Sequence, residues 1–256
     1  YAWGDPRYGG IAVDGSYVTI DGTTYLSNII QIYSTSQAFA ALDNSGYVYA
    51  WGDKYWGGFN NNATDAKIYA TKVNTGSVGN PIENIVQIYS TQAAFAALDN
   101  SGYVYAWGDK DYGGVGSSNS KAQATLLSDL SYIVQIYSTE SAFAALTSKG
   151  YVYAWGGGDA GGEIGDPTVA TQVSDSSGAI ENIVQIYSTY AAFAALTASG
   201  DVYAWGDHVY GGFNNITTAA KKVTTNTSGN TSDLSNIVQI YSTYAAFAAL
   251  TASGDV

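Results

Sequence analysis

The sequence predicts an all-β fold, a β-propeller of five four-stranded blades, and three observations lead to this prediction. A stretch that reads NIVQIYSTYAAFAALTASGDV at 182–202 returns almost unchanged at 236–256, and in looser form at 28–48, 84–104 and 132–152. The tetrapeptide YAWG opens the chain and returns at Tyr49, Tyr105, Tyr153 and Tyr203. The apolar segments are short, rich in β-branched and aromatic residues and bounded by Gly, Asn or Ser, which is typical of strands.

Counted from each YAWG, the chain divides without remainder into repeats, and we expect one repeat domain (1–256) with repeats at 1–48, 49–104, 105–152, 153–202 and 203–256. Each repeat is too small to bury its own faces, so neighbouring repeats must stack. In a closed ring, Tyr1–Trp3 would complete the last blade beside Ala246–Leu250 and lie within about 10 Å of Val256, roughly two strand spacings. The alternative is an excerpt of a longer repeat array.

Four short strands are expected in each repeat. The first is the VYAW segment, such as Tyr47–Trp51, which stops at Gly-Asp. After a loop with a glycine pair comes a weaker strand, expected at Ile68–Val73, Ala122–Leu127, Thr168–Val173 and Ala219–Val223. The third strand reads IVQIY, and the fourth reads AFAAL and ends in a turn such as Asp43–Gly46. Two Asp-Gly pairs between Ile11 and Tyr25 predict an additional hairpin in the first repeat.

The AFAAL strand indicates how the sheets pack. Because side chains alternate along a strand, Ala38, Ala40 and Leu42 point to one face, and Phe39 and Ala41 point to the other. A strand that is apolar on both faces is covered on both faces. Sheets stacked around an axis as propeller blades meet this condition, whereas a two-sheet sandwich would show polar–apolar alternation in most strands.

Composition excludes several functional classes. Nine Lys and Arg against 21 Asp and Glu give a formal net charge of −12, which disfavours nucleic acid and anionic membranes as partners. The absence of Cys excludes disulfides, a thiolate nucleophile and cysteine-ligated zinc. No apolar run approaches the ~20 residues of a membrane helix, so we expect no membrane insertion. A surface solvated by hydroxyl and amide groups leads us to expect an extracellular or cell-surface location.

In order, the repeated segments are IVQIY, the strand that ends in A-L, a turn with Gly, V-Y-x-W-G and a glycine pair. This pattern resembles the repeat of the regulator of chromosome condensation family. The resemblance covers essentially the whole chain and implies a propeller, which in that family usually has seven blades. Where the family has Gly, two residues and His before the A-L strand, this chain has Thr and Ala, as in Thr91 and Ala94. This difference implies a divergent branch that satisfies its inner-strand hydrogen bonds in its own way. Nucleotide exchange on a small GTPase is the activity that the family name implies, but no matching wedge segment or basic tail is present.

Catalysis finds little support in the sequence, and we expect neither an enzyme nor a bound cofactor or metal. The one histidine, His208, follows a Trp-Gly-Asp motif and is expected at the surface. Asp53, Asp109 and Asp207 occupy the same position after Trp-Gly, where a carboxylate accepts hydrogen bonds from turn amides.

Exposed aromatic residues beside asparagine give the candidate binding site. Aromatic faces with neighbouring amides suit sugar rings or peptides, while the competing structural interpretation is that these residues plug the blade edge. The candidates are Tyr55, Trp56, Phe59, Asn60, Tyr112, Tyr210, Phe213 and Asn214. The favoured function is a non-enzymatic scaffold that acts through protein–protein contact or self-association. The alternatives are a lectin-like carbohydrate-binding module and, by family analogy alone, an exchange factor.

Two further expectations concern polar residues. Four N-x-S/T triplets predict glycosylation acceptors on exposed loops, at Asn62, Asn215, Asn226 and Asn230. Glutamines recur at one position of the IVQIY strands and are expected to form hydrogen bonds between blades, because buried amides must be paired; they are Gln31, Gln87, Gln135, Gln185 and Gln239.

Overall fold

The computed structural model describes residues 1–10, 17–20, 24–59, 69–75, 80–114, 123–127, 130–162, 169–213, 219–227 and 230–256. The chain divides into two compact units, Tyr1–Ser131 and Tyr132–Val256, which are described separately. The described residues form β-strands and single 3-10 turns, with no α-helix among them, which confirms the all-β fold. None of the described segments is a helix long and apolar enough to cross a membrane.

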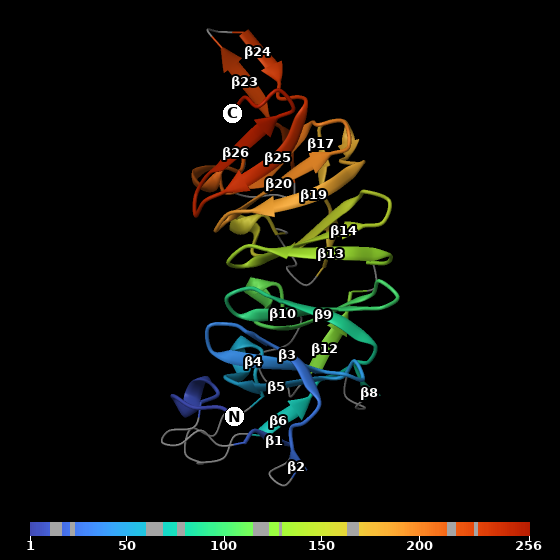
Figure 1. The fold of residues 1–256 in the computed structure, drawn as a ribbon, viewed down its shortest axis with the longest axis vertical. Coiled ribbons are helices and arrows are strands. Elements are labelled where there is room, and N and C mark those ends of the chain that lie inside the picture. Colours follow the sequence, from blue (N-terminus) through green and yellow to red (C-terminus); the bar gives the residue numbers. More distant parts are fainter. Residues whose placement is uncertain are drawn as a thin grey trace. The chain divides into compact units, whose positions relative to one another are not determined.

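Unit 1 contains two large sheets (Figure 1). The first joins β3 (Ile29–Ser34), β4 (Ala38–Asp43), β5 (Val48–Gly52) and β6 (Tyr69–Lys72) in antiparallel order. It is extended by the hairpin of β1 (Thr19–Ile20) and β2 (Thr24–Tyr25), with β1 parallel to β6. The second joins β9 (Ile85–Ser90), β10 (Ala94–Asp99), β11 (Val104–Gly108) and β12 (Gln123–Leu126), and is extended by β7 (Asn74–Thr75) and β8 (Asn80–Pro81).

Unit 2 contains two four-stranded sheets and three two-stranded sheets among its described residues. One sheet consists of β13 (Ile133–Ser138), β14 (Ala142–Thr147), β15 (Val152–Gly156) and β16 (Thr171–Gln172). The next consists of β19 (Ile183–Ser188), β20 (Ala192–Thr197), β21 (Val202–Gly206) and β22 (Lys221–Lys222), followed by the pair β25 (Ile237–Ser242) and β26 (Phe247–Thr251). Two hairpins accompany them, β17 (Ser174–Asp175) with β18 (Gly178–Ala179) and β23 (Thr224–Thr227) with β24 (Asn230–Asp233).

Each main sheet takes its strands from two successive repeats as counted from YAWG. The turn Asp43–Gly46 places AFAAL beside the following VYAW segment, so that Leu42 pairs with Val48 and Phe39 pairs with Trp51. A sheet therefore runs from an IVQIY strand to the weak strand of the next repeat. The expected first hairpin is present as β1–β2, and the other three hairpins were not expected. The proposed single domain and ring closure involve both units and stay predictions.

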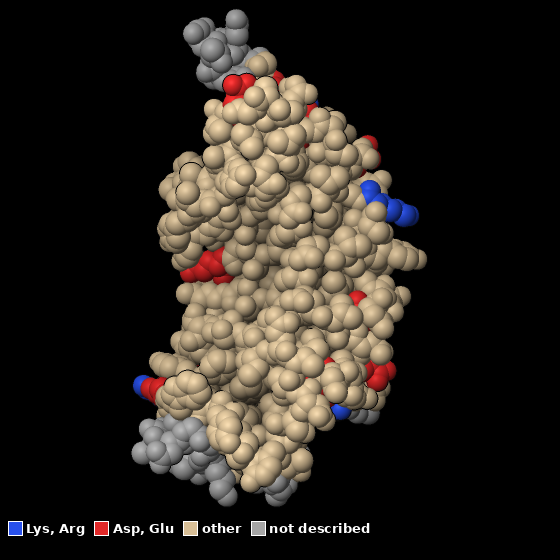
Figure 2. Space-filling view, in the orientation of Figure 1, with Lys and Arg blue, Asp and Glu red and all other residues tan. Residues whose placement is uncertain are grey.

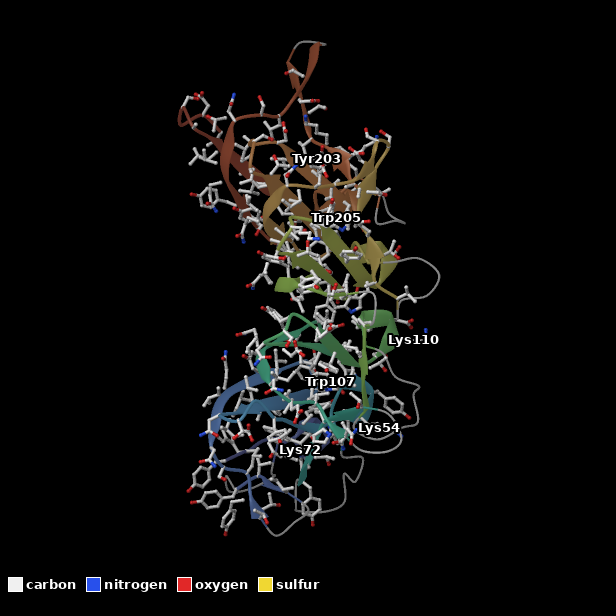
Figure 3. The ribbon with its side chains drawn as sticks, turned by 90° about the vertical axis from the view of Figure 1, so that its right-hand side faces the viewer. Lys54, Lys72, Trp107, Lys110, Tyr203 and Trp205 are labelled. Carbon is white, nitrogen blue, oxygen red and sulfur yellow. The ribbon has the colours of Figure 1, made fainter. Side chains whose placement is uncertain are left out.

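The first four AFAAL strands, β4, β10, β14 and β20, form the cores of the units. All residues of β10 are buried, and the ring of Phe95 stacks on the ring of Trp107 with centroids 5.2 Å apart. The same pair returns in unit 2 as Phe193 and Trp205. Trp107 and Trp205 lie within the stacked sheets of their own units (Figure 3). Within unit 1, one face of β4 packs on β9 (Figure 1), and Ala41 on the other face packs with Val18 and Trp51, so both faces of β4 are covered, as its sequence predicts.

A 3-10 turn follows every described YAWG segment: η1 (Pro6–Tyr8), η2 (Lys54–Trp56), η3 (Lys110–Tyr112), η4 (Gly158–Ala160) and η5 (His208–Tyr210). Asp53 caps η2 by accepting a hydrogen bond from the Tyr55 amide at 2.8 Å. Gly57 ends η2 with φ of 90°, and its carbonyl accepts a hydrogen bond from Trp107 Nε1 at 3.1 Å. The turn of one sheet is thereby fixed to the core of the next sheet.

The expected ladder of glutamine hydrogen bonds between blades is wrong for the described contacts. Gln87 Nε2 donates to the carbonyl of Ile88, its neighbour in the same strand, at 3.3 Å, and Gln185 does the same with Ile186. IVQIY is an edge strand, so this side chain is partly solvated and does not need a distant partner. Neighbouring sheets are joined instead by backbone bonds, such as Ile85 N to Gly46 O at 3.0 Å.

Candidate binding face

Two positions change from repeat to repeat while the backbone around them stays constant. The first follows Ser-Thr between the IVQIY and AFAAL strands and is occupied by Ser36, Gln92, Glu140, Tyr190 and Tyr244. The second is the last residue of each 3-10 turn and is occupied by Tyr8, Trp56, Tyr112, Ala160 and Tyr210. We call these two sets of positions the variable turn face.

A threonine links the two positions within one sheet. Thr189 Oγ1 donates to the carbonyl of Tyr210 at 2.8 Å and accepts a hydrogen bond from the amide of Ala192 at 3.2 Å. In unit 1, the Thr91 hydroxyl makes the same bonds with Tyr112 and Ala94. The threonine hydroxyl thus forms hydrogen bonds with backbone groups at the start of the AFAAL strand. It does so at a position where this sequence differs from the family that it resembles. It also holds the two variable side chains close to each other.

Backbone hydrogen bonds join the first variable position of one sheet to that of the next. The amide of Glu140 donates to the carbonyl of Tyr190 at 2.8 Å, and the amide of Tyr190 donates to the carbonyl of Tyr244 at 3.0 Å. In unit 1, the amide of Ser36 donates to the carbonyl of Gln92 at 2.9 Å. The changing side chains of neighbouring sheets therefore form a row in each unit.

In unit 2 this row produces a cluster of three tyrosines, Tyr190, Tyr210 and Tyr244, which we call the tyrosine cluster. The ring of Tyr190 lies 4.7 Å from that of Tyr244 and 5.3 Å from that of Tyr210, between centroids. Tyr210 and Tyr244 meet nearly edge to face, 5.6 Å apart at 74°. Tyr190 and Tyr210 also pack on the apolar core, whereas Tyr244 is 64% exposed. Two rings of the cluster are thus held by the core, and the ring of Tyr244 is exposed to solvent.

The charged neighbours of the tyrosine cluster are acidic. The Tyr190 hydroxyl is hydrogen-bonded to the Glu140 carboxylate, and this bond is the main cause of the raised pKa of Tyr190. The pKa of Tyr210 is also raised, first by its hydrogen bond with Tyr244 and more weakly by the negative charges of Asp207 and Glu140. These phenols stay protonated at neutral pH, and the surface around them carries negative potential.

The aromatic residues of unit 1 are used differently. Trp56 lies 6.2 Å from Tyr112 between ring centroids, and Trp56 and Phe59 pack against the buried core of the unit. Tyr55 points to solvent, with Lys54 Nζ 4.7 Å from its ring centroid. Trp56 and Phe59 are therefore partly buried, while Tyr55 is accessible, and their use in binding stays a prediction.

The structure brings together only part of the predicted site. Trp56 meets Tyr112, and Tyr210 joins the tyrosine cluster, whereas Phe213 is separately exposed beside Lys221. Asn60, Asn62, Asn214 and Asn215 lie outside the described residues. Asn226 and Asn230 lie on the paired strands of the hairpin β23–β24 and not on loops, because the threonines around them favour strand structure. Their use as glycosylation acceptors stays a prediction.

Sequence reasoning missed Glu140, Tyr190 and Tyr244. These residues lie inside the most strongly repeated stretch, which draws attention to what is shared between copies. The signal that could have found them is a difference between copies and not a similarity. The residue after Ser-Thr differs among copies whose flanking strands are nearly identical. Variation at a fixed position of a constant frame marks a surface that is free to change.

The predicted capping role of the aspartates is confirmed. Asp109 Oδ1 accepts from the amide of Asp111 at 2.9 Å, and Asp207 Oδ1 accepts from the amide of Val209 at 2.7 Å. His208 is largely exposed, with Nδ1 3.6 Å from Asp207 Oδ1. Within the described part of the chain, no group of three or more His, Cys, Asp or Glu side chains is arranged to hold a metal ion.

No protein-family model matches the chain. The E3 ubiquitin-protein ligase HERC2 of Homo sapiens is 32% identical over 142 residues, which is 51% of this chain and 3% of that protein, and HERC2 of Mus musculus matches equally. The chain therefore spans only a small part of these relatives.

Solved structures give a broader match. Human WBSCR16 has a TM-score of 0.53 at 21% identity, covering 78% of this chain and 55% of its own. Prp20p from Saccharomyces cerevisiae has a TM-score of 0.51 at 21% identity, and the match covers 88% of this chain and 56% of Prp20p. Yeast RCC1 (Prp20) bound to Kap60 has a TM-score of 0.52 at 20% identity, and the match covers 88% of this chain and 54% of its own. The chain spans about half the length of these proteins. It is therefore built from β-propeller repeats with the RCC1 fold.

Proposed function

We propose that this chain is a non-enzymatic repeat scaffold that binds a protein partner through its variable turn face. The observation that carries the proposal is the tyrosine cluster, which is built at variable positions and open to solvent at Tyr244. Tyrosine rings are large, rigid and amphipathic, and clusters of them are typical of protein interfaces. Binding is also known among proteins with this fold, since Prp20p has been studied for its binding to Gsp1p and histones.

The proposal includes an extracellular or cell-surface location, with self-association as one mode of partnering. In Figure 2 most of the visible surface is neither acidic nor basic, and the acidic side chains are scattered among neutral ones. Only 12% of the residues are charged, so hydroxyl and amide groups provide most of the polar surface. Such a surface is consistent with the expected location. The position of the partner site is argued from the variable turn face alone.

A photo-crosslinking experiment tests where the partner binds. A photoreactive amino acid replaces Tyr244 in one version of the chain and Tyr241 in a matched version, because both side chains are more than half exposed and belong to the same repeat. Each version is irradiated in extract and culture medium of the source organism, and as the purified chain alone. We expect a discrete cross-linked protein, or a dimer of the chain, from position 244 and not from position 241. Equal products from both positions would contradict the proposal.

The lectin-like alternative is tested on the same material. The exposed ring of Tyr55 and the partly exposed ring of Phe213 are the features that favour sugar binding. A glycan array is probed with the unmodified chain and with variants Tyr55→Ala and Phe213→Ala. Saturable binding that these variants abolish, without a cross-linked protein from position 244, would favour carbohydrate recognition over protein binding.

A further inference from the structure

We infer that the tyrosine cluster and Glu140 together receive an arginine side chain of the protein partner. This inference rests on the proposed function and names the chemistry that the partner presents. The site comprises the exposed ring of Tyr244, the rings of Tyr190 and Tyr210 beside it, and the carboxylate that is hydrogen-bonded to Tyr190.

The first argument comes from other tyrosines of the chain, which carry a cation from the chain itself. Lys72 Nζ lies 3.2 Å from the ring centroid of Tyr47, and Lys54 Nζ lies 4.7 Å from that of Tyr55. A positive charge over an aromatic face is attracted by the negative potential of that face. Among the described contacts, no lysine or arginine lies over the rings of the tyrosine cluster.

The second argument compares equivalent 3-10 turns. In η1, the guanidinium carbon of Arg7 lies 5.4 Å from the ring centroid of Tyr8, the last residue of the turn. In η5, Tyr210 occupies the position of Tyr8, but the residue before it is Val209, which is exposed. The turn that contributes to the cluster therefore lacks the cation that its counterpart supplies. A partner residue of the same type would restore that contact.

The third argument is charge complementarity. Glu140 and Asp207 both place negative charge near the cluster, and the chain as a whole has a net charge of −12. One hydrogen bond from Tyr190 leaves acceptor sites on the Glu140 carboxylate, since an ionised carboxylate accepts about four. Arginine suits this environment better than lysine, because its planar guanidinium stacks on a ring and donates several hydrogen bonds in a fixed geometry.

The test uses the full chain and a fluorescein-labelled peptide in which arginines are separated by glycine–serine pairs. The matched peptide carries citrulline, which keeps the shape of arginine and removes its charge. Binding is followed by fluorescence anisotropy. We expect the citrulline peptide to bind at least about fivefold more weakly, because the ion pair and the cation–π contact are each worth about two- to fivefold at exposed sites.

Two variants and two controls locate the site. Glu140→Gln and Tyr244→Ala are each expected to weaken binding of the arginine peptide by about two- to fivefold. Glu181→Gln removes one negative charge from an exposed position of the same unit, and Tyr241→Ala removes another exposed ring, so both controls should bind as the unmodified chain does. Unchanged circular dichroism and melting temperature show that each variant is folded. Equal weakening by Glu140→Gln and Glu181→Gln would mean general attraction to an acidic protein and would overturn the inference.

The outcomes separate this inference from the proposed function. If a partner cross-links from position 244 but the arginine and citrulline peptides bind equally, the protein-binding role stands and the arginine inference fails. If position 244 yields no product beyond that of position 241 and the peptides do not discriminate, both fail. Discrimination that depends on Glu140 and Tyr244 supports both.

Discussion

Tyr132 shows how one residue can depart from an otherwise uniform frame. Four equivalent positions hold asparagine with φ of 58–59°, and Tyr132 takes the same left-handed conformation with φ of 60°. Asparagine tolerates this region, whereas a residue with a bulky side chain is strained there. Tyr132→Asn should therefore raise the free energy of unfolding by about 1 kcal/mol. Urea denaturation measures the change, and an unchanged or lowered stability would contradict the account of this turn.

A comparison of Gly57 with Gly178 separates the cost of backbone strain from the cost of steric contact. The φ of 90° at Gly57 disfavours any side chain, and an added Cβ would also lie 2.6 Å from Phe95 Cδ2 in the next sheet. Gly178 has φ of 135° with open space around its Cβ position. We expect Gly178→Ala to cost about 1–2 kcal/mol from the backbone alone, and Gly57→Ala to cost at least about 3 kcal/mol. Similar melting temperatures for the two variants would show that the contact with Phe95 is unimportant.

Single residues were predictable where a local rule decides them. The caps by Asp53, Asp109 and Asp207 follow from a short-range preference of carboxylates for turn amides, and the structure confirms them. The tyrosine cluster depends on which residues from different repeats meet in space. That arrangement is set by the stacking of sheets, which no local pattern at Tyr190 or Tyr244 describes.

At the scale of the elements, the indole of the VYAWG strand joins one sheet to the next. Trp107 is almost fully buried, and its Nε1 donates to the carbonyl of Gly57 at 3.1 Å. Trp107→Phe keeps an aromatic ring on Phe95 but leaves that buried carbonyl without its donor. The expected cost is about 1–3 kcal/mol in the free energy of unfolding. The control is Trp3→Phe, since Trp3 is 76% exposed, and equal effects of the two changes would contradict this role.

The three strongly patterned strands of each repeat were predictable because apolar content, β propensity and turn residues agree within them. The short hairpins β7–β8, β17–β18 and β23–β24 were not, because their residues are mostly polar and their pairing depends on a neighbouring strand. In β7, for example, Asn74 and Thr75 run parallel to Gln123 and Ala124 of β12, which belong to another repeat. The position of Gln87 in an apolar strand likewise indicated a buried amide, but its strand lies at a sheet edge.

At the scale of the whole molecule, partly buried tyrosines should make the fold sensitive to alkali. Burial is the main cause of the raised pKa of Tyr49, Tyr105, Tyr137 and Tyr203. In the unfolded chain these phenols ionise near pH 10, so above that pH the unfolded state loses protons that the folded state keeps. The stabilisation is complete below about pH 10 and is lost as the pH rises further. Thermal melts should therefore be constant between about pH 8 and about pH 9 and fall steeply towards about pH 11.

Phenolate absorbance provides the check on this explanation. If these tyrosines are the cause, absorbance from the folded chain should lag behind that of the urea-unfolded chain over the same pH range. Superimposable titration curves for the two states would refute the linkage, whatever the melting temperatures do.

The central claim is that a protein partner binds the variable turn face. Hydrogen exchange of the chain, alone and with the partner identified by cross-linking, tests this claim most directly, because it reports on every described segment at once. If the variable turn face of unit 2 is the binding site, bound partner should slow exchange at 138–141, 189–191, 208–211 and 243–245. The exposed edge strands, such as Ile237–Ser242, should exchange as they do in the free chain. Protection of those edge strands, or of unit 1 alone, with no change in the four segments would contradict the account.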